Sequence, residues 1–270
     1  MSAPTPSAPA RRPSAPPAAP ASAPPRTDAA RLLNVVRLHL ANPWTTVVLP
    51  LVILAGIFAV NWSIWAIIIG AIPPGDRADA QEGFAWNGAL FYVFSYMLFV
   101  GSSAMTATFA YAMSLGLTRR EFYLGSLLTF AGLSAAYAVL FTVLAEVERA
   151  TGGWGVGGSM FAGQLLGIDV GVPARLWTFF LGLLFSFTLG AAVSAVFVRW
   201  RSTGLLAFFL ALGLLLVGLA ALVTLTQSWP AVGRWFVDAG PVGVVTALLV
   251  PTAAAAVAGY AVLRRATPRE

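Results

Sequence analysis

The sequence predicts an all-α membrane protein with about six transmembrane helices, preceded by an amphipathic helix in the membrane interface. Hydrophobic residues make up 59% of the 270 residues and charged residues only 10%, whereas a soluble domain carries about 25% charged residues. The mean hydropathy is +0.82. Apolar stretches long enough to cross a bilayer, which takes about 20 residues, recur along the chain at 47–71, 86–110, 124–144, 176–198, 204–226 and 242–263. These stretches define a transmembrane domain at 44–265.

The chain before the first apolar stretch divides into two parts. Residues 1–27 are almost all Ser, Ala and Pro, which predicts a disordered tail because this composition forms neither helix nor core. Residues 28–43 fit a helix lying in the interface, with Asp28 as a cap and Arg31 and Arg37 on its polar face. His39 falls on the apolar side of that helix, as a proton or metal group or simply as an interfacial side chain.

The distribution of arginine predicts the orientation in the membrane. Twelve arginines are expected on one side of the membrane, because each either precedes the first apolar stretch or follows the second, the fourth or the last. They are Arg11, Arg12, Arg26, Arg31, Arg37, Arg119, Arg120, Arg199, Arg201, Arg264, Arg265 and Arg269. Four lie on the other side: Arg77, Arg149, Arg175 and Arg234. Because positive residues are retained in the cytoplasm, both termini are expected there, including a short tail at 266–270.

Missing residue types exclude several kinds of site. The chain has no Cys, one His and no Lys, which leaves no thiolate or multi-His metal site and no Lys for a phosphate-binding P-loop. We therefore expect no catalytic residue, cofactor or metal in this chain.

The arginines lie at helix ends rather than in one patch, which argues against nucleic acid. The Ala, Gly, Pro and Arg bias is typical of a GC-rich bacterial genome and suggests the bacterial plasma membrane.

The strongest local motif is at 115–123, between the second and third apolar stretches. Gly116 suits the left-handed residue that ends a helix. Thr118 and Glu121 form a Thr-x-x-Glu capping box for the next helix, and Leu117 and Phe122 occupy the positions of a hydrophobic staple. A tight turn is expected, with Arg119 and Arg120 at its exposed tip.

This layout resembles the type-2 ABC exporter permeases. Bacterial members commonly carry a Gly-x-Ser/Thr-Arg-Arg-x-Phe/Tyr-like coupling turn between spans 2 and 3. The resemblance implies a permease that pairs with a second copy or a paralogue in the lipid bilayer. ATP would bind to a separate ATPase subunit, docked on the turn at Thr118, Arg119, Arg120 and Glu121. Two features differ: only about 15 residues separate the last two spans, and the longest outer loop, with a Gly-rich part at 151–171, follows the third.

Other patterns leave alternatives open. A small residue at every fourth position, at Gly182, Ser186, Gly190 and Ser194, lets two helices approach closely, either within the bundle or in a dimer. The Gly-rich loop could be a flexible outer gate or a simple connection. An ion-coupled secondary transporter and a non-transporting scaffold or immunity protein remain alternatives to the exporter. An enzyme is disfavoured because the outer acidic residues show no recognisable spacing.

Overall fold

The structure, a computed structural model, describes residues 28–163 and 170–266, and every regular element in these ranges is a helix. The expected tail at 1–27, part of the Gly-rich loop (164–169) and residues 267–270 lie outside the described residues. Five of the described helical stretches are long and apolar enough to cross a membrane. The prediction of an all-α membrane protein is therefore confirmed, and the chain is of the multi-pass kind.

The N-terminal part contains α1 (Asp28–Leu40), a π-helical turn (Trp44–Val48) and α2 (Leu49–Ala71). Pro50 has no backbone N–H, so the carbonyl four residues before it loses its usual helical donor. The hydroxyl of Tyr137 approaches the carbonyl oxygens of Thr46 and Val47 at 3.3 and 3.2 Å. A side chain from another helix thus replaces the donor that proline removes.

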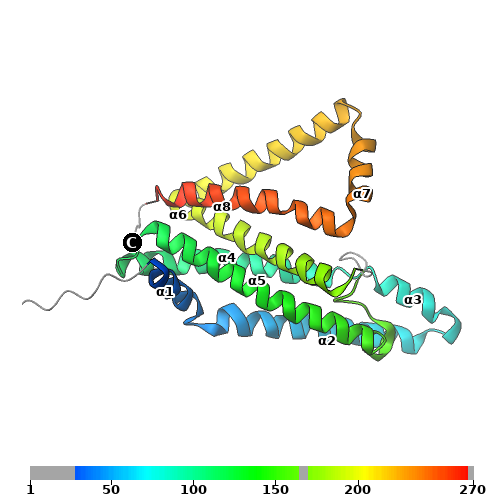
Figure 1. Cartoon of the computed structure of the whole chain (residues 1–270). Helices are drawn as coiled ribbons and strands as arrows, with labels where there is room; N and C mark the ends of the chain where they lie inside the picture. The colour runs from blue at the N-terminus through cyan, green and yellow to red at the C-terminus, as the bar shows by residue number, and fades with distance from the viewer. Residues whose placement is uncertain (1–27, 164–169, 267–270) are drawn as a thin grey trace, which may run out of the picture.

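A short 3-10 turn (Pro74–Asp76) and α3 (Arg77–Phe84) form the connection from α2 to α4 (Ala89–Ser114), and α5 (Arg119–Ala150) follows. Helices α4 and α5 run antiparallel through the centre of the molecule (Figure 1). Both extend several residues beyond the apolar stretches expected at 86–110 and 124–144. A second π-helical turn (Gly153–Gly157) comes after α5.

Helix α6 (Val172–Leu225) covers two of the expected spans in one 54-residue run. The run is broken at Arg201, whose φ of 60° and ψ of −150° are not helical. We call residues 172–200 the first arm and residues 202–225 the second arm. Figure 1 shows that the second arm turns back from this point and diverges from the bundle, so the two arms correspond to the two apolar stretches expected at 176–198 and 204–226.

The last part of the chain contains α7 (Trp229–Ala247) and α8 (Leu249–Leu263). Gly240 has a φ of 61° and is followed by Pro241, so α7 turns a corner there. The residues after this corner continue into α8 and return towards the end of the molecule where α1 lies (Figure 1). The expected span at 242–263 therefore comprises two helical pieces. Ala266, expected as the first residue of a tail, is buried.

The core lies where α4, α5 and the first arm of α6 meet. Phe130 of α5 stacks on Phe187 of α6 with ring centroids 5.3 Å apart, and Phe141 meets Phe179 edge-on at 5.5 Å. The second arm behaves differently, because its large apolar side chains are exposed over most of its length. The bundle and the second arm are thus packed to very different degrees.

The break at Arg201 should be strained, and Arg201→Gly should raise the thermal stability of the purified protein. Its backbone conformation is one that glycine adopts freely, at a cost of about 1–3 kcal/mol for other residues. The substitution also removes a guanidinium that lies 5.8 Å from the Phe197 ring, a contact worth about 0.5–1 kcal/mol. The matched control is Arg199→Gly within the regular first arm, which should lower stability because glycine weakens a helix. If both substitutions changed the thermal stability equally, the backbone at Arg201 would not be strained.

Candidate functional site

The turn between α4 and α5 is built from backbone hydrogen bonds that close α4. Leu117 donates from its backbone N–H to the Ala112 carbonyl at 3.2 Å, and Gly116 donates to Met113 at 3.1 Å. This pair of bonds is a Schellman motif, and Gly116 has the left-handed φ of 75° that the motif requires. The prediction that α4 ends at Gly116 is confirmed.

A capping box begins α5, as expected. The Glu121 N–H donates to Thr118 Oγ1 at 3.2 Å, and the Thr118 N–H donates to the Glu121 carboxylate at 2.8 Å. Two helices of 26 and 32 residues are therefore joined by a four-residue turn whose ends are both capped. Such a turn keeps the two helix ends in a fixed relation.

The four residues expected to form a docking surface have different surroundings. Glu121 is engaged within the chain, because its second oxygen also accepts from the Arg31 guanidinium at 3.0 Å. Thr118 is exposed but serves as the cap. Arg119 is partly buried and donates to the backbone carbonyl of Arg264 at 3.1 Å. Arg120 is exposed, and it is the residue of the four with the freest access to a partner.

Helix α1 packs against α5 just behind this turn. A Cβ atom on Gly125 would come within 2.5 Å of Val35 Cβ, so Gly125 lets the two helices approach closely. His39, expected on the apolar side of α1, is buried against α5. Its Nε2 lies 2.8 Å from Ser126 Oγ, and that hydroxyl in turn donates to the Phe122 carbonyl.

The protonation of His39 follows from these bonds. Because Ser126 gives its hydrogen to Phe122, the His39 Nε2–H acts as the donor to Ser126. Burial lowers the pKa of the imidazole to about 4, so His39 is uncharged near neutral pH. A structural contact between α1 and α5 therefore describes His39 better than a proton relay or a metal ligand. Its Nδ1 has no hydrogen-bond partner among the described residues.

The stripe of small residues on the first arm of α6 lies against α4. A Cβ on Gly190 would overlap the Leu98 carbonyl oxygen, and one on Gly182 would come within 3.0 Å of the Phe94 ring. Ser194 Oγ makes contacts of 2.7 and 2.8 Å with the hydroxyl and the carbonyl of Ser102. Ser186, the remaining member of the stripe, donates to the Gly182 carbonyl on its own helix. Within the chain, Gly182, Gly190 and Ser194 therefore let α4 and α6 come together.

A buried carboxylate organises the outer loop, which sequence reasoning missed. Glu148 is 2% exposed, although the sequence placed it among scattered loop residues. Its carboxylate accepts the backbone N–H groups of Met160, Phe161 and Ala162 at 2.9, 3.2 and 2.9 Å. It also accepts the Trp154 indole N–H at 2.7 Å. The described part of the Gly-rich loop is thus tied to α5 through Trp154 and residues 160–162.

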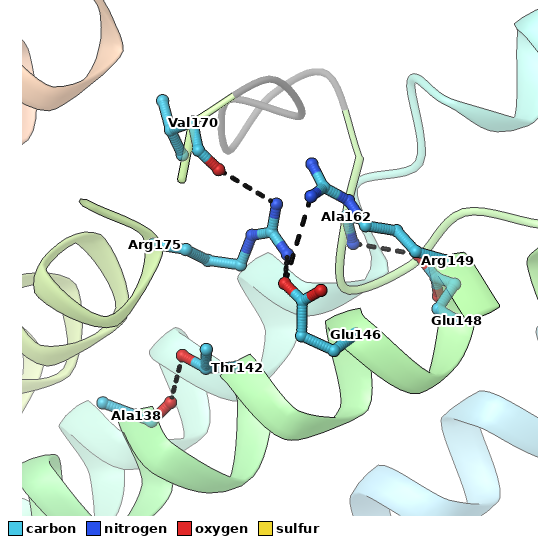
Figure 2. Close-up of polar contacts among 8 residues, drawn as sticks. All are labelled: Ala138, Thr142, Glu146, Glu148, Arg149, Ala162, Val170 and Arg175. Atoms are coloured by element: carbon cyan, nitrogen blue, oxygen red, sulfur yellow. Dashed lines mark hydrogen bonds and ion pairs between the residues drawn. The ribbon is translucent and has the colours of Figure 1, made fainter. Parts of the chain in front are cut away.

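An ion pair lies beside this carboxylate (Figure 2). Arg175 at the start of α6 is 1% exposed, and its guanidinium donates to Glu146 at 2.6 Å and to the Val170 carbonyl at 3.2 Å. Arg149 approaches the same Glu146 oxygen at 3.9 Å. Charged residues from the end of α5 and the start of α6 therefore meet, contrary to the expectation that the outer acidic residues form no pattern. The sequence contained a signal for this cluster, because acidic and basic residues occur together at the end of one span and just before the next. These residues are Glu146, Glu148, Arg149 and Arg175.

Known proteins give no further guide to the family of the chain. No family model, no curated protein and no solved structure matches it.

Proposed function

We propose that this chain is the membrane subunit of an ABC-type exporter, working as a pair of permease chains and driven by a separate ATPase that docks on the turn between α4 and α5. The observation that carries the proposal is the turn itself. It is short, capped on both sides and placed between two long membrane helices, with Arg120 exposed at its tip. A partner that moves this turn would move both helices with it, whereas a flexible loop would absorb the movement.

The charge distribution supports a cytoplasmic position for the turn. Eight described arginines lie at the end of the bundle that holds α1, the turn, the break in α6 and the end of α8: Arg31, Arg37, Arg119, Arg120, Arg199, Arg201, Arg264 and Arg265. Four lie towards the other end: Arg77, Arg149, Arg175 and Arg234. By the positive-inside rule the first end faces the cytoplasm, where an ATPase has access to ATP, and both chain termini lie on that side of a bacterial plasma membrane.

The composition also supports an ATPase partner. The chain has no Lys for a P-loop. Charged residues of the long helices lie near their ends, at Glu146, Glu148, Arg149 and Arg175 on the outer side, rather than at mid-membrane as in a proton relay. An energy source outside the chain agrees with both facts and favours the exporter over the ion-coupled alternative.

Reversing the charge of the turn should prevent ATPase docking. We expect the double substitution Arg119→Glu, Arg120→Glu to weaken association by at least about thirtyfold, equivalent to about 2 kcal/mol, because an ion pair across an interface costs about 2–5 kcal/mol to disrupt. Arg120→Glu alone should produce most of the effect, since Arg119 is engaged with the residue that follows α8. The measurement is pull-down of ATPase subunits from gently solubilised membranes.

The matched control is Arg265→Glu, an exposed arginine at the same end but outside the turn. It should leave docking unchanged. Reporter fusions at Glu270 and near Gly155 would show in the same strains that the variants keep the C-terminus in the cytoplasm and the loop after α5 outside. Normal docking by a correctly inserted double variant would rule out the turn as the docking site. Failure of the unaltered chain to bind any ATPase would contradict the exporter proposal.

A further inference from the structure

A large apolar cavity lies between the two arms of α6 and α8. Its volume is about 720 Å³, within the range of about 300–1,000 Å³ that small-molecule sites occupy. Val196 and Trp200 line it from the first arm, Ala207 and Phe208 from the second arm, and Ala258 and Val262 from α8. Three helical segments therefore surround a space that side chains of the described residues do not fill.

The surroundings of the cavity favour an apolar occupant. The second arm packs so little that Leu206, Leu210 and Leu214 are 72%, 63% and 65% exposed. Water in a space with almost wholly apolar walls would lose hydrogen bonds without compensation. Within a membrane, an acyl chain meets no such penalty.

The end of the cavity near the break in α6 is rich in positive charge. The Arg199 guanidinium lies 4.3 Å from the centre of the Trp200 ring, which itself lines the cavity. Arg201 is at the break, and Arg264 and Arg265 come directly after the part of α8 that lines the cavity. The acidic side chain that the structure describes at this end of the bundle is Glu121, and its negative charge is already paired with Arg31.

The backbone at the break in α6 has an unusual conformation. Arg201 holds a conformation with φ 60° and ψ −150° that side chains other than glycine rarely adopt. Strained residues of this kind concentrate at ligand-binding and switching sites. The Arg201 guanidinium lies 5.8 Å from the Phe197 ring. Guanidinium groups bind carboxylates and phosphates with paired hydrogen bonds, so an anionic head group at the break would meet Arg199 and Arg201.

We propose that this cavity is a binding site for an anionic membrane amphiphile, with its acyl chain between the arms of α6 and α8 and its head group at Arg199 and Arg201. The site is a property of this chain alone and requires no ATPase. A second copy of the chain or uncharged bulk lipid could also cover apolar helices, but neither would make use of the arginines at the break.

The test uses the purified full chain and two photoreactive probes of equal length. One is a palmitic acid bearing a diazirine in its chain, and the other is the matching uncharged alcohol. After illumination, the labelled peptides are mapped by mass spectrometry. We expect the acid to label residues 192–208 and 258–262 at least about tenfold more strongly than the alcohol, equivalent to about 1.4 kcal/mol.

Two sets of variants separate the cavity from its charged end. Ala207→Trp with Ala258→Trp places bulk in the cavity and should abolish labelling, whereas Ala220→Trp with Ala253→Trp, on the same helices but outside the lining, should not. Arg199→Gln with Arg201→Gln should reduce labelling by the acid to the level of the alcohol. Arg234→Gln, at the other end of the molecule, should have no effect.

Three results would overturn the proposal. Equal labelling by acid and alcohol would mean that bulk lipid fills the space without selection for charge. Labelling that persists in the Ala207→Trp, Ala258→Trp variant would place the probe elsewhere. Crosslinks from this region to a second copy of the chain, in place of the probe, would identify the cavity as an interface. None of these results depends on an ATPase, so they leave the exporter proposal to its own test.

Discussion

Gly190→Leu should be among the most destabilising single substitutions in the membrane bundle. A Cβ at this position would overlap the Leu98 carbonyl and come within 3.0 Å of the Ser102 nitrogen. Both are backbone atoms of α4, so no side chain can rotate away, and α4 and α6 would have to separate. Overpacking costs about 1–3 kcal/mol and sometimes more, and here the separation would also break the Ser194–Ser102 contact.

The measurement for Gly190→Leu is thermal unfolding of the purified protein in detergent. Gly213→Leu is the matched control, because Gly213 lies in the second arm of the same α6 element and a Cβ there would meet no described atom within 4 Å. That control should change the unfolding temperature little or raise it, since leucine favours a helix over glycine. A Gly190→Leu protein as stable as the Gly213→Leu protein would show that α4 and α6 do not meet at this stripe.

Glu148→Ala should release the described part of the outer loop from α5. The substitution leaves the backbone N–H groups of Met160, Phe161 and Ala162 and the indole N–H of Trp154 without their acceptor. Each buried donor left unpaired costs about 1–3 kcal/mol. The loop will therefore open to water rather than stay in place, and we expect a local loss of structure with a smaller effect on the bundle.

Two measurements would detect this release. Hydrogen exchange at Met160, Phe161 and Ala162 should accelerate by orders of magnitude, and a protease added from outside should cut within residues 151–163. Glu82→Ala removes an exposed carboxylate of α3 on the same side and serves as the control, with no change expected in either measurement. Unchanged exchange in the Glu148→Ala protein would mean that the loop is held by other contacts.

The parts of the fold that sequence could predict are those with local causes. The apolar stretches predicted the membrane helices because each needs only its own length and composition. The turn at Gly116–Glu121 was predictable in detail because the Schellman motif and the capping box involve residues at most five positions apart. Their physics does not depend on the rest of the fold.

The parts that sequence could not predict depend on distant segments. The sequence around Glu148 does not distinguish it from other acidic residues, because its role depends on the backbone at 160–162, which folds back over it. His39 fits an interfacial position until Gly125, 86 positions later in the chain, provides the space for α1 to pack on α5. The break in α6 occurs at Arg201, a residue type that gives no local signal for a left-handed φ, so only its position between two apolar stretches predicted a turn there.

The contacts of the first turns of α5 have a mechanical consequence. On one side, Arg31 and Val35 fix α1 to these turns; on the other, Tyr123 donates to the Ala256 carbonyl at 2.8 Å and Arg119 to that of Arg264. The segment is therefore a junction between the N-terminal helix α1 and the last crossing of the chain. A displacement applied at this junction would therefore move α1 and α8 together, and α8 forms one wall of the apolar cavity.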